Sequence, residues 1–121
     1  MVLILGGRAA GKTAFVQSLG YPDEAISDDV ASDRAVLDHL EALVRSDPAS
    51  ADALLPLLVK KEIVICQEVG SGVIPLDPSN RAFREAVGRL CCALAKEASA
   101  VVRIVCGIPI TIKGELSCTS N

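Results

Sequence analysis

Apolar residues along the chain fall into two kinds of pattern, continuous runs and stripes at helical spacing. Continuous runs are typical of strands that are buried on both faces of a parallel sheet. They occupy residues 2–5, 62–66, 100–106 and 108–112, and residues 24–27 form a further short strand or an extended loop. Stripes at helical spacing predict helices. They occupy residues 14–19, 33–45, 51–60 and 78–99.

Strands that alternate with helices predict an α/β fold with a small, mostly parallel sheet and helices on both faces, which makes three layers. In such folds the ligand binds at the carboxyl ends of the strands. The chain has 121 residues, enough for one domain with a modest core. We therefore expect a single domain over residues 1–114, followed by a polar, disordered tail at residues 115–121.

The composition argues against several classes of function. Aromatic residues make up 2% of the chain, so stacking platforms for single-stranded nucleic acid are essentially absent. A net charge of -3 offers no basic footprint for DNA or RNA. No apolar run has the length of a membrane span. Five cysteines, an odd number without a C-x-x-C pair, predict a reducing, cytoplasmic location and argue against a structural disulfide or metal site.

One octet between the first predicted strand and the first predicted helix carries a specific chemistry. It reads Gly6-Gly7-Arg8-Ala9-Ala10-Gly11-Lys12-Thr13 and matches the phosphate-loop pattern G-x-x-x-x-G-K-[ST]. Its glycines let backbone N–H groups point at a phosphate, Lys12 reaches the outer phosphates and the Thr13 hydroxyl holds Mg²⁺. A glycine-rich turn with a surface lysine is the competing interpretation. The flanking strand and helix favour a phosphate-loop fold that binds a nucleoside triphosphate.

A second candidate lies at the end of the strand predicted at residues 62–66. Glu68 follows that strand by two residues. Phosphate-loop enzymes use an acid in such a place to hold Mg²⁺ or to accept a proton. A surface glutamate after a strand is common, so the assignment of Glu68 depends on the phosphate loop.

The region around Glu68 resembles a known family. The segment Cys66-Gln67-Glu68-Val69-Gly70-Ser71-Gly72-Val73-Ile74-Pro75 is similar to the N-E-V-G-x-G-I-V-P motif of the adenosylcobinamide kinase/adenosylcobinamide-phosphate guanylyltransferase family. Further matches follow in order. They are Arg81-Ala82-Phe83-Arg84-Glu85, Gly88-Arg89-Leu90, Val105-Cys106-Gly107-Ile108-Pro109 and Lys113. The resemblance covers residues 1–20 and 62–114; the family's members are longer, and the missing part precedes residue 62.

The resemblance implies an activity and its participants. The family uses ATP or GTP with Mg²⁺ to phosphorylate adenosylcobinamide, a corrinoid, and then transfers GMP from GTP to the product. It also assembles as a homo-oligomer. By this likeness Gly70, Gly72 and Pro75 form a loop over the substrate, and Arg81 or Arg84 meets phosphate charge. Plain solvation on a helix is the competing interpretation for both arginines.

The family's nucleotidyl-accepting histidine lies in a helix of pattern R-I-x-x-H-x-x-x-R. The one histidine here, His39, is spaced differently from its neighbouring arginines, Arg34 and Arg45. A competing alignment sets residues 36–40 against a family strand, V-L-L-D-C-L, which would leave His39 without a role. We prefer the helix because the apolar spacing is helical rather than alternating. His39 is then the candidate nucleotidyl carrier, and an ordinary half-exposed helix histidine is the other interpretation.

Three functions follow from these observations. The first is a compact relative of the family with one or both of its activities. The second is a nucleotide-binding protein that has lost transferase activity together with the missing segment. The third is a kinase for another small alcohol that uses the same phosphate loop and Glu68.

Overall fold

The computed structural model describes residues 1–68 and 78–115. In this part of the chain, six strands form one sheet in the order β2-β3-β4-β1-β5-β6. The strands are β1 (Val2–Gly6), β2 (Ile26–Ser27), β3 (Val36–Leu37), β4 (Ile63–Gln67), β5 (Ala100–Val105) and β6 (Ile108–Lys113). The α-helices are α1 (Lys12–Ser18), α2 (Leu40–Ser46), α3 (Leu55–Leu58) and α4 (Pro78–Glu97). Two 3₁₀ helices complete the elements, η1 (Asp23–Ala25) and η2 (Pro48–Leu54).

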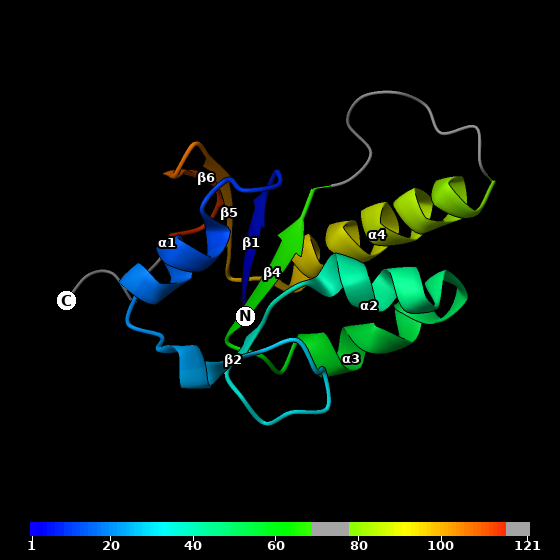
Figure 1. The fold of residues 1–121 in the computed structure, drawn as a ribbon, viewed down its shortest axis with the longest axis horizontal. Coiled ribbons are helices and arrows are strands. Elements are labelled where there is room, and N and C mark those ends of the chain that lie inside the picture. The colour runs from blue at the N-terminus through cyan, green and yellow to red at the C-terminus, as the bar shows by residue number, and fades with distance from the viewer. Residues whose placement is uncertain (69–77, 116–121) are drawn as a thin grey trace.

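Helices lie on both faces of the sheet. Helix α1 covers one face, while α2, α3 and α4 cover the other (Figure 1). Side chains alternate along the central strands, so that Leu3 and Val64 pack with α4, and Ile4 and Ile65 pack with α1. All of these side chains are fully buried. The predicted three-layer α/β fold with a mostly parallel sheet is therefore confirmed.

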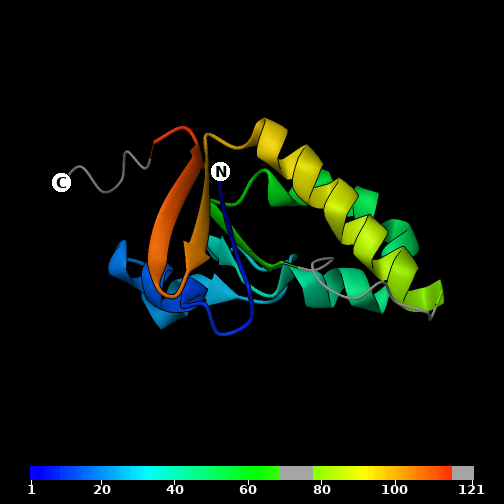
Figure 2. The ribbon, with the colours of Figure 1, turned by 90° about the horizontal axis from the view of Figure 1, so that it is seen from above.

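Strands β1 to β5 pair in parallel, and β6 alone runs antiparallel. It returns from β5 through a two-residue turn at Cys106 and Gly107, whose φ angles are 50° and 77°. Positive φ at both central residues is the geometry of a type I′ hairpin turn, which suits the twist of the two strands. In Figure 2 this hairpin, coloured orange, lies on the same side of the molecule as α1.

The helix predicted at residues 33–45 is wrong in its first half. Val36 and Leu37 form the parallel strand β3, and α2 begins only at Leu40. The competing interpretation is correct in placing a strand here, but that strand covers only Val36 and Leu37, and His39 is already the N-cap residue of α2. Because β3 is buried on both faces, its residues do not alternate between apolar and polar. A short buried strand followed at once by a helix therefore produces the same apolar stripe as one long helix.

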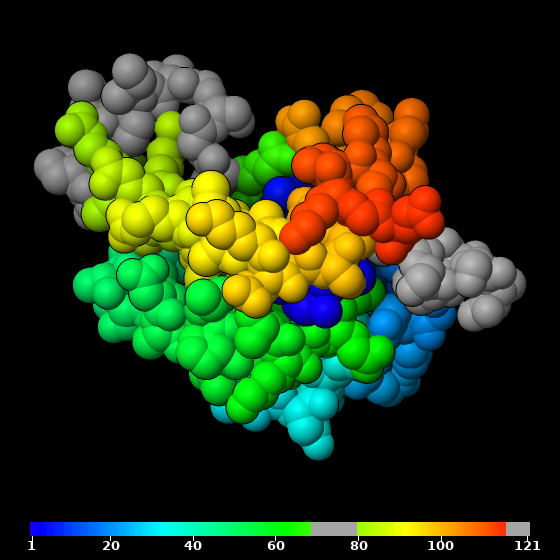
Figure 3. Space-filling view, turned by 180° about the vertical axis from the view of Figure 1, so that it is seen from behind, coloured from blue at the N-terminus to red at the C-terminus, as the bar shows by residue number. Residues whose placement is uncertain are grey.

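The other predicted elements agree with the structure within a few residues. The helix expected at residues 51–60 begins late, as Pro56 allows: a 3₁₀ helix reaches Leu54, and α3 starts at Leu55 with the proline in its first turn. Helix α4 lies across η2 and α3, as Figure 3 shows for the yellow and green surfaces. None of the helices in the described residues is long and apolar enough to cross a membrane.

The burial of two leucines predicts how much each contributes to the free energy of unfolding. Leu37 on β3 is fully buried, whereas Leu57 on α3 is 43% exposed. The substitution Leu37→Ala should lower the free energy of unfolding by about 2–5 kcal/mol, because it leaves a cavity between sheet and helices. Leu57→Ala, the matched control, should change it by less than about 1 kcal/mol. Urea unfolding followed by circular dichroism measures both, and equal effects would contradict the assigned burial of β3.

Candidate nucleotide-binding site

The phosphate loop connects β1 to α1, and two of its glycines lie where a side chain would not fit. A Cβ atom at Gly6 would lie 2.9 Å from the carbonyl oxygen of Ile104 on β5. Gly11 has a φ of 95°, in the left-handed region that favours glycine. A Cβ there would also lie 3.3 Å from the Cα atom of Gly107. Close packing and backbone conformation therefore both require glycine in this loop.

The turn of the β5–β6 hairpin supports the phosphate loop from one side. The backbone N–H of Gly107 donates a hydrogen bond to the carbonyl oxygen of Ala10 at 2.8 Å. Within the loop, the N–H of Ala10 donates to the carbonyl of Gly7, and the Lys12 ammonium donates to the same carbonyl at 2.6 Å. The lysine side chain thus lies along the loop and keeps its charge beside the loop backbone.

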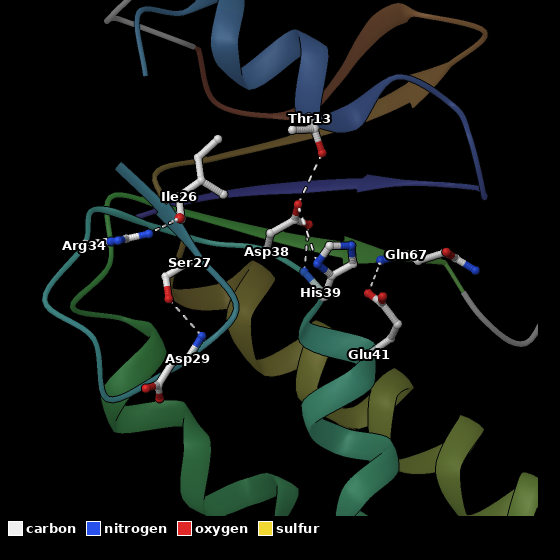
Figure 4. A network of polar contacts seen from close by, with 9 residues as sticks. All are labelled: Thr13, Ile26, Ser27, Asp29, Arg34, Asp38, His39, Glu41 and Gln67. Atoms are coloured by element: carbon white, nitrogen blue, oxygen red, sulfur yellow. Dashed lines mark hydrogen bonds and ion pairs between the residues drawn. The ribbon is translucent and has the colours of Figure 1, made fainter. Parts of the chain in front are cut away.

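Asp38 is the acidic residue that the structure brings to the phosphate loop. It follows β3 directly, and its side chain is only 10% exposed. One carboxylate oxygen, Oδ2, accepts a hydrogen bond from the Thr13 hydroxyl at 3.2 Å, and the other accepts one from the backbone N–H of His39 at 2.7 Å. Figure 4 shows Asp38 between Thr13 and the start of α2. The sequence interpretation missed Asp38 because it placed this residue inside a helix.

His39 lies beside Asp38, at the start of a helix rather than inside one as predicted. It is the N-cap residue of α2 and has a left-handed backbone, with φ 58°. Its imidazole is 62% exposed, and Nδ1 lies 3.8 Å from Asp38 Oδ2. The structure therefore brings His39 beside Thr13 and Asp38, whereas Arg34 and Arg45, the arginines of the family pattern, lie before β3 and at the far end of α2.

Glu41 is a second acid that sequence reasoning did not single out. It lies in the first turn of α2, and its Oε1 accepts a hydrogen bond from the backbone N–H of Gln67 at 2.8 Å. This contact joins the start of α2 to the end of β4 (Figure 4). Glu41 could have been predicted from its position, because it lies in the first turn of a helix that follows a buried strand.

These side chains surround a pocket of about 370 Å³ in front of the phosphate loop. The residues that line it come from the loop and α1, from the junction of β3 with α2 and from the end of β4: Ala9, Ala10, Gly11, Lys12, Thr13, Ala14, Asp38, His39, Glu41 and Gln67. One wall is therefore cationic and rich in backbone N–H groups, and the opposite wall carries two carboxylates. Such a pocket suits a polyphosphate together with a divalent cation.

Glu68 faces a different partner from the one expected. Its two carboxylate oxygens accept hydrogen bonds from Arg103 on β5, at 2.7 Å to Nε and 3.1 Å to Nη2. Its backbone N–H donates to the carbonyl of Gly6, the first residue of the phosphate loop. The ion pair ties β4 to β5 across β1, next to the pocket. The proposed role of Glu68 in metal or proton handling stays a prediction.

The remaining predicted site residues lie on α4 or before it. Arg81 and Arg84 are on α4, and neither is among the residues that line the pocket in the described part of the chain. The substrate loop predicted from Gly70, Gly72 and Pro75 lies outside the described residues, as does the tail beyond residue 115. Lys113 donates hydrogen bonds to the carbonyl oxygens of Ala95 and Lys96, so this lysine caps the end of α4.

The donors beside the phosphate loop fit a magnesium ion. Mg²⁺ prefers oxygen ligands and is commonly held by one or two carboxylates and by the phosphates of a nucleotide. Thr13 supplies a hydroxyl and Asp38 a nearly buried carboxylate that already points at it. Among residues 1–68 and 78–115 no three acidic, histidine or cysteine side chains cluster as a self-sufficient metal site. Thr13 and Asp38 would therefore need phosphate oxygens or water to complete the coordination of such an ion.

Two thiols lie in the core next to Gln67, which lines the pocket. The sulfur atoms of Cys66 on β4 and Cys91 on α4 are 3.8 Å apart. The hydrogen bond between them, together with burial, raises the pKa of the Cys66 thiol well above its ordinary value. The same hydrogen bond lowers the pKa of Cys91. The contact therefore couples two thiols on adjoining elements.

Comparison with protein families gives one match. The family described as cobinamide kinase/cobinamide phosphate guanyltransferase matches residues 30–112. The match begins after the phosphate loop and includes β3, Asp38 and α2, which the sequence resemblance had left aside. No curated protein sequence matches the chain significantly.

The family match includes the acidic residues of the site, whereas the phosphate loop precedes the matched residues. The fold has helices on both faces of a mostly parallel sheet and a pocket in front of the phosphate loop, and well over half of the chain matches one enzyme family. The chain therefore belongs to the cobinamide kinase/cobinamide phosphate guanyltransferase family, whose enzymes act in cobalamin biosynthesis.

Proposed function

We propose that the protein binds ATP or GTP at the phosphate loop and transfers the terminal phosphoryl group to the hydroxyl of adenosylcobinamide. The observation that carries this proposal is the hydrogen bond from Thr13 to Asp38 within the pocket in front of the loop. It joins the residue that ends the phosphate loop to a nearly buried carboxylate on a separate strand. Family membership supports the choice of a corrinoid alcohol as acceptor.

Each part of the pocket has a role in phosphoryl transfer. The backbone N–H groups of the phosphate loop bind and orient the phosphates, and Lys12 neutralises charge on the transferred group. Thr13 and Asp38 would hold Mg²⁺, which supplies further neutralisation of phosphate charge. Such transfer needs positioning and charge neutralisation more than a covalent catalyst, so a small site suffices.

We further propose that His39 carries GMP in the second activity of the family. An unprotonated imidazole nitrogen would attack the α-phosphorus of GTP, form a phosphorus–nitrogen bond and release pyrophosphate as the P–O bond breaks. The exposure of the His39 ring at the pocket wall supports this role, since the ring is accessible to a bound nucleotide. The nearby Asp38 carboxylate would favour a proton on the facing Nδ1 and leave Nε2 to attack.

Replacement of Lys12 tests nucleotide binding. Lys12→Ala removes charge-assisted hydrogen bonds to phosphate, which are worth about 1.5–3 kcal/mol each, so the Kd for ATP or GTP should rise by about tenfold or more. Lys60→Ala, which changes an exposed lysine that does not line the pocket, is the matched control. Titration calorimetry measures both variants. Wild-type affinity in Lys12→Ala would refute the assigned site.

Replacement of Asp38 tests the cation site. In Asp38→Asn the amide oxygen can still accept the hydrogen bond from His39 N–H, so the start of α2 is retained. The lost charge should raise the Mg²⁺ concentration that gives half-maximal turnover by at least about tenfold. Changes to residues that only support a metal ligand already cost that much in metal affinity. Asp52→Asn on η2, an exposed acid, is the control. A magnesium titration of ATP hydrolysis or cobinamide phosphorylation reports the shift, and an unchanged curve would exclude Asp38 as ligand.

Replacement of His39 tests the second transfer. Wild-type protein incubated with Mg²⁺ and GTP labelled at the α-phosphate should acquire an acid-labile label that survives denaturing electrophoresis, and His39→Ala should acquire none. Phosphorylation of cobinamide should continue in the variant, because the kinase step does not need the imidazole. Absence of label on the wild type, with GTP still bound, would restrict the protein to the kinase activity or to nucleotide binding alone.

A further inference from the structure

Two cysteines from elements far apart in sequence meet in the core between the sheet and α4. Cys66 lies on β4 and Cys91 on α4, and their sulfur atoms are 3.8 Å apart. Both pack in the apolar cluster that joins the sheet to α2, α3 and α4. Cys66 is fully buried, while Cys91 is partly exposed. A reagent from solvent therefore reaches the pair through Cys91.

The two sulfurs lie near van der Waals contact, which is longer than a disulfide bond. The bond has a length of about 2.05 Å, so the two sulfurs need to approach by a little under 2 Å. Side-chain rotation and a small shift of α4 on the sheet accommodate such a movement. The neighbouring Cys92 is exposed and lines a groove on the outer face of α4 with Arg89 and Lys96. Adjacent cysteines on one helix thus have opposite surroundings.

We propose that Cys66 and Cys91 are a redox modification site, which forms a reversible intramolecular disulfide on exposure to hydrogen peroxide. The Cys91 sulfur attacks the peroxide oxygen, the O–O bond breaks, and a sulfenic acid and one water are produced. The Cys66 sulfur then attacks the sulfenic sulfur of Cys91, and the S–O bond breaks. The sulfenic hydroxyl leaves with the proton of the Cys66 thiol as a second water. Both sulfurs are oxidised, the peroxide is reduced, and two thiols with one hydrogen peroxide yield one disulfide and two waters.

The cross-link would act on the nucleotide pocket. Cys66 pairs with Leu5 on β1, and the next pair along the strands is Gln67 with Gly6, the first residue of the phosphate loop. Gln67 also donates to Glu41 in the pocket wall. A bond that draws Cys66 toward α4 displaces the end of β4, and with it Gln67 and Glu41. The oxidised protein should therefore bind nucleotide more weakly, a consequence that rests on the proposed function.

Peptide mapping tests the disulfide without reference to nucleotide. Full-length protein is treated with hydrogen peroxide, alkylated and digested with trypsin, which releases Cys66 in residues 62–81 and both Cys91 and Cys92 in residues 90–96. These two peptides should be linked in the wild type and in Cys92→Ser, and separate in Cys91→Ser. Reduction with dithiothreitol should release them. A link that persists in Cys91→Ser, or pairs that chiefly contain Cys106 or Cys118, would overturn the proposal.

Nucleotide affinity tests the consequence for the pocket. Reduced, oxidised and re-reduced samples are titrated with ATP or GTP, with Cys91→Ser treated in parallel. Oxidation should raise the Kd at least severalfold in the wild type and in Cys92→Ser, reversibly, and should leave Cys91→Ser unchanged. By linkage, bound nucleotide should shift the equilibrium between disulfide and thiols in a dithiothreitol redox buffer toward the thiols by the same factor. A mapped disulfide with unaltered affinity would refute the coupling, whereas loss of binding in the reduced protein would refute the proposed function instead.

Discussion

The parallel pairing of the central strands is the constraint on which the site depends. Strand β1 pairs with β4 and β5, and β4 also pairs with β3. Because parallel strands end at the same edge of the sheet, the residues that follow β1, β3 and β4 meet there. The phosphate loop, Asp38 and Gln67 come together for this reason and line one pocket. Pairing along the backbone thus places charged groups that lie far apart in sequence.

The pocket is held from two directions by contacts of different character. On one side the β5–β6 turn approaches so closely that glycine is required at Gly11, and Gly107 donates a hydrogen bond to the loop. On the other side Asp38 accepts hydrogen bonds from the Thr13 hydroxyl and from the backbone N–H of His39 at the start of α2. A nearly buried carboxylate is stable only when its oxygens are satisfied in this way. The same carboxylate is then available to a cation that arrives with phosphate.

Neighbouring elements couple the pocket to the core beneath it. Glu68 pairs with Arg103 and joins the strands on either side of β1, and Glu41 joins α2 to β4 through Gln67. Cys66, which directly precedes Gln67 on β4, contacts Cys91 on α4. Close packing makes this region respond as a unit, because a shift at β4 has no empty space in which to be absorbed. The proposed effect of the disulfide on the nucleotide pocket depends on this continuous packing.

Local patterns determined a large part of this protein. The phosphate loop, the four longer strands and the long helix α4 follow from apolar runs, periodicity and the octet at residues 6–13, because each signal lies within one continuous segment. The role of residues 36–39 could not be obtained that way. Whether Val36 and Leu37 join a helix or a sheet depends on the strand that lies beside them, and β4 is more than twenty residues away along the chain. That pairing made Asp38 the end of a strand and brought it to Thr13, and long-range packing likewise brought Cys91 to Cys66. Contacts between distant segments carry no local periodicity, so the tertiary structure alone established them.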